Sequence, residues 1–167
     1  MASSARQSNV LKPATFVFDV DGVFNSGQFL YTIEGKFAKI FGPHDNDGIK
    51  LLRPHLTIEA ISADKRGWEI TRKRIESDME IPVRLVSEAE RVTYFREKGN
   101  LPSCIYMGDG LYDIPIFRLV GYSIAPANAL PLVKKAASFV TEARGGEGAV
   151  AEACLHVLEK FFEPFAF

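Results

Sequence analysis

Short apolar runs alternate with amphipathic segments along most of the chain. The apolar runs end at small or polar residues, which is typical of strands in a buried sheet. They lie at residues 15–20, 57–62, 83–86, 103–107, 122–125 and 138–141. Apolar residues at helical spacing predict helices between them, at about 47–53, 67–79, 88–98, 113–120, 130–137 and, most clearly, 150–161.

This alternation predicts an α/β fold of the Rossmann type, with three layers and helices on both faces of a mostly parallel sheet. Residues 28–32 and 36–41 differ, because Ile33-Glu34-Gly35 between them predicts a β-hairpin. We therefore expect one domain over residues 13–167, with a hairpin flap at about 28–41, after a loose polar leader at residues 1–12. Ligands of such sheets bind at the carboxyl ends of the strands.

Composition and charge narrow the classes of function. The 167 residues carry 20 basic and 21 acidic side chains, and this net charge of −1 gives no general attraction for nucleic acid or anionic membranes. No apolar stretch approaches the roughly 20 residues that cross a bilayer. Cys104 and Cys154 lie in apolar runs and are expected to be reduced, buried thiols. We expect a cytoplasmic protein with no nucleic-acid or membrane partner.

Two aspartates stand at the carboxyl end of the first predicted strand. Asp19 and Asp21 are two residues apart, and Gly22 allows the chain to turn sharply after them. A turn with two solvated aspartates is the alternative. The apolar run before them favours a site instead, because unpaired carboxylates at its buried end are costly and a bound cation would relieve that cost.

A second acidic loop follows the strand at 103–107. Asp113 could be the N-cap of the next helix, with Pro115 just beyond, whereas Asp109 has no such role. Mg²⁺ prefers oxygen ligands and usually takes one or two carboxylates. The expected magnesium-binding residues are Asp19, Asp21 through its main-chain oxygen, Asp109, and Asp113 in support.

Ser62 ends the strand predicted at 57–62. A serine in this position is usually a turn or cap residue. Beside two acidic strand ends, however, its hydroxyl and the amides that follow, beginning with Ala63, could hold a phosphate group.

Taken in order, these motifs resemble those of the haloacid dehalogenase superfamily, over about residues 15–162. They are Asp19-Val20-Asp21-Gly22, Ser62, and Gly108-Asp109-Gly110 with Asp113. The hairpin, residues 44–52 and residues 145–150 resemble the small branch without a cap domain, and no insertion here is long enough for a cap. That branch contains 3-deoxy-D-manno-octulosonate 8-phosphate phosphatases and the phosphatase-like domain of some acylneuraminate cytidylyltransferases.

The resemblance implies a Mg²⁺-dependent phosphatase in which Asp19 forms an aspartyl-phosphate and Asp21 acts as acid and then as base. The implied substrate is an acid sugar phosphate, such as octulosonate 8-phosphate or a nonulosonate 9-phosphate. The residues expected to bind substrate or phosphate are Gly22, Ser62, Ala63, Lys65 and Asp45.

Three departures from the superfamily pattern bear on activity. A basic residue, usually Lys, is expected near the helix before the second acidic loop. Arg91 is the candidate and Lys65 the alternative, although Arg91 could instead be an exposed helical residue paired with Glu88. Members of the branch typically have Gly-Asp-Asp where this chain has Gly108-Asp109-Gly110, and they often have Arg where this chain has Glu147. Arg144, Lys65 or Arg66 could compensate for the charge missing there.

The predicted hairpin bears on assembly. In the branch that the chain resembles, the hairpin of one subunit closes over a neighbour's active site. An isolated hairpin is marginally stable in water, so we expect a homotetramer. The alternative to an enzyme is a non-catalytic oligomerisation or regulatory module associated with nucleotide-sugar synthesis. The four intact aspartates of the two acidic loops weigh against it.

Overall fold

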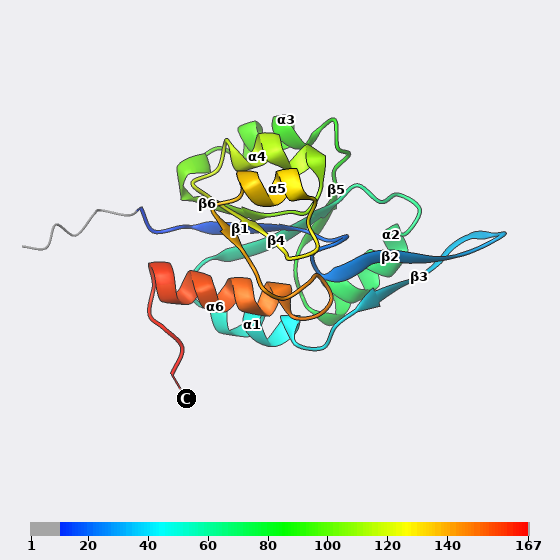
Figure 1. Cartoon of the computed structure of the whole chain (residues 1–167), viewed down its shortest axis with the longest axis horizontal. Coiled ribbons are helices and arrows are strands. Elements are labelled where there is room, and N and C mark those ends of the chain that lie inside the picture. Colours follow the sequence, from blue (N-terminus) through cyan, green and yellow to red (C-terminus); the bar gives the residue numbers. More distant parts are fainter. Residues whose placement is uncertain (1–10, 167) are drawn as a thin grey trace, which may run out of the picture.

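The computed structural model describes residues 11–166 and places a six-stranded sheet at the centre of the molecule (Figure 1). Every neighbouring pair of strands in it is parallel. In spatial order the strands are β5 (Val83–Leu85), β4 (Thr57–Ser62), β1 (Thr15–Asp19), β6 (Cys104–Met107), β7 (Tyr122–Ala125) and β8 (Phe139–Val140). This confirms the predicted Rossmann-like α/β fold.

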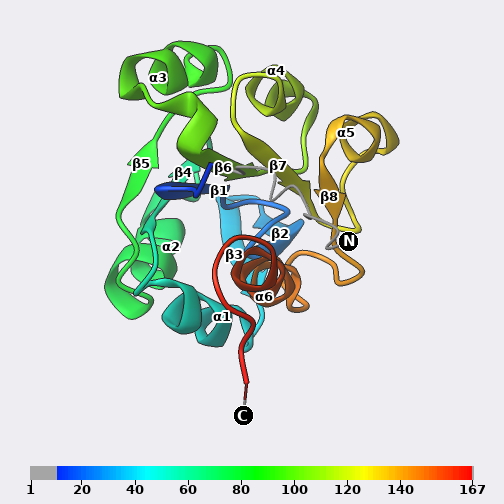
Figure 2. The same ribbon diagram turned by 90° about the vertical axis from the view of Figure 1, so that its left-hand side faces the viewer.

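Helices cover both faces of the sheet, as the view along it shows (Figure 2). One face carries α3 (Arg91–Lys98), α4 (Ile114–Phe117) and α5 (Pro131–Ala136), and the other carries α1 (Asp45–Leu52), α2 (Trp68–Arg72) and α6 (Ala149–Phe161). Successive side chains of β1 point to opposite faces. Phe16 and Phe18 therefore enter the core under α1 and α6, and Val17 enters the core on the other side.

Several elements begin or end at other residues than the apolar pattern predicts. The helix expected at 67–79 is α2 followed by a π-helical turn, Lys73–Asp78. The helix expected from residue 88 begins at Arg91, because Ser87 and Glu90 form a hydrogen-bonded turn before it. A 3₁₀ turn, Leu111–Asp113, precedes α4. A second 3₁₀ turn, Leu101–Ser103, precedes β6.

The predicted hairpin is present and projects from the sheet (Figure 1). It consists of β2 (Asn25–Thr32), which begins three residues before the predicted start, and β3 (Gly35–Phe41). Leu30 pairs with Ala38 but Tyr31 pairs with Lys36, so Phe37 is an extra residue, a β-bulge.

The predicted leader falls mostly outside the described residues, so the boundary at residue 12 stays a prediction. Between residues 11 and 166, no helix is long and apolar enough to cross a membrane.

Candidate active site

The carboxyl ends of β4, β1 and β6 lie side by side because these strands are neighbours in a parallel sheet. The loops after them, together with the hairpin, enclose a pocket of about 380 Å³. The pocket is lined by Asp19, Asp21, Phe29, Lys36, Ala63, Asp64, Glu88, Arg91, Asp109, Gly110, Tyr112 and Asp113.

Three carboxylates from two strand ends converge in this pocket. Oxygen atoms of Asp19, Asp109 and Asp113, which we call the acidic cluster, lie within 4.8 Å of one another. Glycine makes this approach possible. A Cβ atom at Gly22 would lie 2.0 Å from Oδ2 of Asp109, and one at Gly108 would lie 2.4 Å from Oδ2 of Asp113. The glycines of both sequence motifs therefore leave room for the carboxylates.

The acidic cluster is short of positive charge. Burial raises the pKa of Asp19 to about 8, although Arg91 opposes the shift. Burial likewise raises the pKa of Asp109 to about 7, with a further rise from the charge of Asp113. Such carboxylates take up a proton unless a cation keeps them ionised. Hard divalent cations prefer oxygen ligands of this kind, so the residues of the cluster fit a divalent metal ion.

Arg91 contacts two carboxylates of the acidic cluster and is only 4% exposed. Its two terminal nitrogens donate hydrogen bonds of 3.0 Å to the two oxygens of Asp19. One of these nitrogens also contacts Asp113 and donates to the hydroxyl of Tyr106, 3.0 Å away. The structure therefore places Arg91 in the site, and the alternative of an exposed arginine paired with Glu88 is wrong.

Asp113 points into the site as well. Its side chain makes no capping hydrogen bond to α4. One oxygen accepts a hydrogen bond of 2.7 Å from the hydroxyl of Tyr106, and the other accepts one of 2.9 Å from the amide of Gly110. The carboxylate therefore stabilises the acidic loop and faces Arg91.

Asp21 lines the same pocket, but its carboxylate is not part of the acidic cluster. One oxygen accepts a hydrogen bond of 2.8 Å from the side-chain amide nitrogen of Asn25 and lies 2.8 Å from Nζ of Lys39. The other accepts a hydrogen bond of 3.3 Å from the hydroxyl of Ser62. These contacts hold the Asp21 carboxylate in one orientation.

The residues predicted to hold phosphate differ in where they lie. Ala63 lines the pocket. Ser62 is fully buried and does not line the pocket, and its hydroxyl accepts a hydrogen bond of 3.1 Å from the amide of Asp64. Lys65 is exposed and does not line the pocket. Asp45 also lies outside the pocket, where it accepts a hydrogen bond of 3.2 Å from the amide of Ala151 near the start of α6.

Several site residues were not foreseen in the sequence. They are Asn25, Phe29, Lys36, Lys39, Asp64, Tyr106 and Tyr112. Tyr106 had a weak signal, since it is the polar residue inside an otherwise apolar strand. Lys36 and Lys39 had none, because three residues apart in a regular strand they would face opposite sides.

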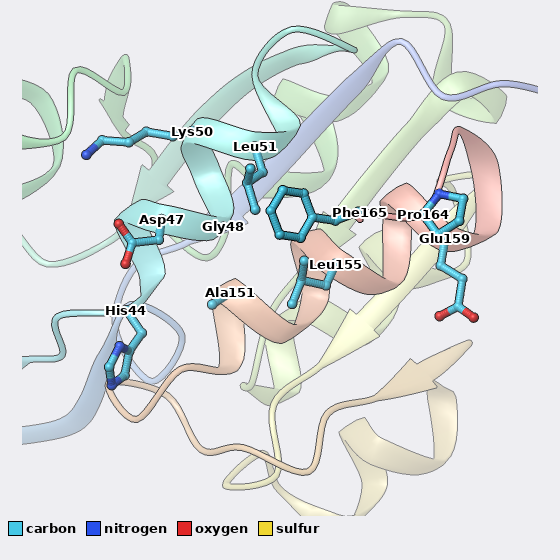
Figure 3. Close-up of a pocket in the computed structure, with 10 residues that line it drawn as sticks. All are labelled: His44, Asp47, Gly48, Lys50, Leu51, Ala151, Leu155, Glu159, Pro164 and Phe165. Atoms are coloured by element: carbon cyan, nitrogen blue, oxygen red, sulfur yellow. The ribbon is translucent and has the colours of Figure 1, made fainter. Parts of the chain in front are cut away.

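A larger hollow of about 770 Å³ lies between α1, α6 and the C-terminal tail (Figure 3). Its apolar middle is formed by Leu51, Leu155 and Phe165, with His44 at one end and Glu159 at the other. None of the carboxylates of the acidic cluster lines it. Its size alone therefore does not make it the active site.

Comparison with known proteins gives consistent results. A family model for haloacid dehalogenase-like hydrolases matches residues 94–153. The 3-deoxy-D-manno-octulosonate 8-phosphate phosphatase of Haemophilus influenzae is 33% identical over 141 residues, which cover 81% of this chain and 77% of that protein.

Two solved structures show the same fold. The cobalt-bound form of the phosphatase from H. influenzae has a TM-score of 0.76 and 30% identity, covering 89% of this chain and 88% of its own. The phosphatase from Moraxella catarrhalis, in complex with magnesium, phosphate and KDO, has a TM-score of 0.74 and 26% identity, covering 88% of this chain and 86% of its own.

The sequence relative and the fold agree with the geometry of the pocket. Strand-end carboxylates, a buried arginine and a hairpin beside them occur here in one pocket. The chain therefore belongs to the haloacid dehalogenase-like hydrolases, in the family of the 3-deoxy-D-manno-octulosonate 8-phosphate phosphatases, and is a phosphoric monoester hydrolase.

Proposed function

We propose that this protein hydrolyses a sugar phosphate monoester, with Mg²⁺ as cofactor, through an aspartyl-phosphate formed on Asp19. One observation carries the proposal. Three carboxylates, those of buried Asp19 and Asp113 and of half-buried Asp109, converge within 4.8 Å, and a fourth, that of Asp21, is held in the same pocket by hydrogen bonds.

The first half of the reaction is attack by a carboxylate oxygen of Asp19 on phosphorus. The bond from phosphorus to the sugar oxygen breaks as the new bond forms, and Asp21 gives the leaving oxygen a proton. Arg91 orients Asp19 through its paired hydrogen bonds. Mg²⁺ bound at the acidic cluster would supply neutralisation of the charge on the phosphoryl oxygens.

The second half is hydrolysis of the aspartyl-phosphate. Asp21, now ionised, takes a proton from a water molecule, whose oxygen attacks phosphorus. The bond between Asp19 and phosphorus breaks, so Asp19 is regenerated as a carboxylate and Asp21 is again protonated. Asn25, Lys39 and Ser62 support this exchange because they fix the Asp21 carboxylate.

The names of the relatives support a particular first substrate. The curated relative is named for octulosonate 8-phosphate, and the M. catarrhalis structure contains magnesium, phosphate and KDO. We therefore propose an acid sugar phosphate, with octulosonate 8-phosphate tested first and a nonulosonate 9-phosphate second.

The test is release of phosphate from these esters with and without Mg²⁺. Asp19→Asn removes the nucleophile with little change of shape and should abolish turnover. Asp78→Asn is the matched control, because Asp78 lies outside the pocket and pairs with exposed Lys73. Equal turnover by the wild type and Asp19→Asn would exclude the mechanism.

We also propose a homotetramer. The hairpin exposes Leu30, Tyr31, Ile33, Phe37 and Ile40, each at least half exposed in the single chain. Large apolar patches of this kind typically mark contacts with another protein. Sedimentation analysis should give the mass of four chains, and a purely monomeric profile would contradict this proposal.

A cytoplasmic location stays a proposal. It is supported by Cys104 and Cys154, which are both buried and free of disulfide bonds. Localisation of a tagged chain by cell fractionation would test it.

A further inference from the structure

The hairpin supplies one side of the pocket. Phe29 and Lys36 come from the hairpin, and Asp64 comes from the loop after β4. Nζ of Lys36 lies 2.5 Å from Oδ2 of Asp64 and 3.4 Å from the centroid of the Phe29 ring. The Lys36 side chain is only 4% exposed, so this is a buried contact and not a surface ion pair.

Two features of the backbone produce this arrangement. The bulge at Phe37 brings Lys36 and Lys39 to the same side of the hairpin, although side chains at positions i and i+3 of a regular strand face opposite sides. Gly67 leaves room for Asp64 and for both lysine side chains. A Cβ atom there would lie 2.3 Å from Oδ2 of Asp64 and 2.6 Å from Cε of Lys39. A larger residue at position 67 would push the lysines away from Asp64.

The pair lies next to the reacting atoms. Nζ of Lys39 is 2.8 Å from Asp21 and 2.8 Å from Asp64, so a single ammonium group separates the two carboxylates. Asp21 is the residue that protonates the leaving oxygen in the proposed reaction. Lys36 and Asp64 are therefore within reach of the first few carbons of the leaving group, beside the ester oxygen.

The charges around this point are already balanced. Lys36 pairs with Asp64, and Lys39 pairs with both Asp21 and Asp64. The remaining pocket-lining cation among residues 11–166, Arg91, pairs with residues of the acidic cluster. A substrate carboxylate at this point would meet Asp64 and find no unpaired cation. Hydroxyl groups can donate to a carboxylate and accept from an ammonium group.

We propose that Lys36 and Asp64 form a subsite that recognises hydroxyl groups on the two or three carbons next to the phosphate ester and rejects a carboxylate there. The inference rests on the proposed function and specifies its leaving group as a polyol chain end. A long sugar acid satisfies this rule when its carboxylate lies at the end far from the phosphate.

Binding without turnover gives the first test. The chain with Asp19→Asn, in Mg²⁺, is titrated calorimetrically with glycerol 3-phosphate and with 3-phosphoglycerate, which differ in a hydroxymethyl group and a carboxylate at the same carbon. We expect the polyol ester to bind at least about tenfold more tightly, because the carboxylate is repelled by Asp64. Equal affinities, or tighter binding of the acid, would overturn the inference.

Two variants in the active background give the second test. Asp64→Asn removes the repelling charge but can still accept the hydrogen bond from Gly67, so it should narrow the preference for glycerol 3-phosphate over 3-phosphoglycerate, measured here as the ratio of their kcat/KM values. Lys36→Met should lower the ratio of kcat/KM for glycerol 3-phosphate to that for phenyl phosphate by about tenfold. Arg53→Gln, at an ion pair outside the pocket, is the control and should leave the ratio unchanged.

The outcomes separate the two proposals. If Lys36→Met slows both esters equally, the ion pair only anchors the hairpin and the subsite is excluded. If the wild type binds the polyol ester selectively but releases no phosphate from any ester, the proposed hydrolysis is wrong while the subsite stands.

Discussion

On the sheet side of the pocket, three carboxylates of the acidic cluster face a single arginine, and burial raises the pKa of Asp19 to about 8. On the hairpin side, Lys36 and Lys39 face Asp21 and Asp64. Burial alone would raise the pKa of Asp64, but hydrogen bonds from both lysines lower it to about 2. The two sides are neighbours, yet only one carries an excess of negative charge.

The difference separates two tasks. Carboxylates without enough cations are unfavourable in the free protein, so we expect a bound divalent metal ion to complete the sheet side. The hairpin side is complete by itself and holds Asp21 and the leaving-group subsite in place. A divalent metal ion should therefore stabilise the folded chain through the residues of the sheet side, and substitutions in the hairpin should leave metal binding intact.

The largest effect on stability is expected from the arginine of the sheet side. Arg91→Met leaves Asp19 and Asp113 without their buried partner and should lower the free energy of unfolding by about 3–5 kcal/mol. Urea denaturation measures this. Arg91→Lys keeps the positive charge and should lower the free energy of unfolding by less. Lys73→Met, at an exposed pair with Asp78, should cost less than about 1 kcal/mol. A fully stable Arg91→Met would contradict the proposed role of this cation.

The rise in Tm that Mg²⁺ produces should depend only on the residues of the sheet side. Asp109→Asn should abolish the rise in Tm that Mg²⁺ produces and slow phosphate release by on the order of 10²-fold, since one ligand is lost. Asp64→Asn is the matched change on the hairpin side and should keep the Mg²⁺-dependent rise. If both variants lose it, the division of the pocket into two sides is wrong.

The hairpin side should respond to loss of its buried lysine. Lys39→Met leaves Asp21 and Asp64 with fewer donors, so the free energy of unfolding should fall by about 2 kcal/mol. Hydrogen exchange of the amides of β2 and β3 should accelerate as the hairpin loses its contacts with Asp21 and Asp64. Unchanged exchange in the hairpin would show that Lys39 does not anchor it.

The smallest expected effect is on pH dependence. The pKa of Asp19 is about 8 in the folded protein against 3.8 for an ordinary Asp, so folding takes up a proton between these values. Without divalent metal, the free energy of unfolding should therefore fall as pH rises from about 5 to 8. Mg²⁺ binds the ionised form, so its effect on Tm should be a few degrees larger at about pH 8 than at pH 5.5. Asp19→Asn should reduce this difference.

The apolar pattern and the motifs predicted much of the molecule. Buried apolar runs that end in Asp and Gly indicated which strand ends carry the site. The structure brings Asp19, Asp109 and Asp113 together at the carboxyl ends of the strands. This was predictable because the signals are local. The period of two along a strand, the turn after a strand and the space left by Gly22 and Gly108 all follow from adjacent residues.

Tertiary structure alone decided the rest. Arg91 is 72 residues from Asp19 along the chain, and only the packing of α3 on the sheet selects it over Lys65. The position of Lys36 depends on the register of the two hairpin strands, where one extra residue, Phe37, reverses which side a lysine faces. Asp45 contacts α6 and does not line the pocket, because α1 packs against α6 in the folded chain. Register and packing between distant segments are set by the whole folded chain, so no local pattern in the sequence records them.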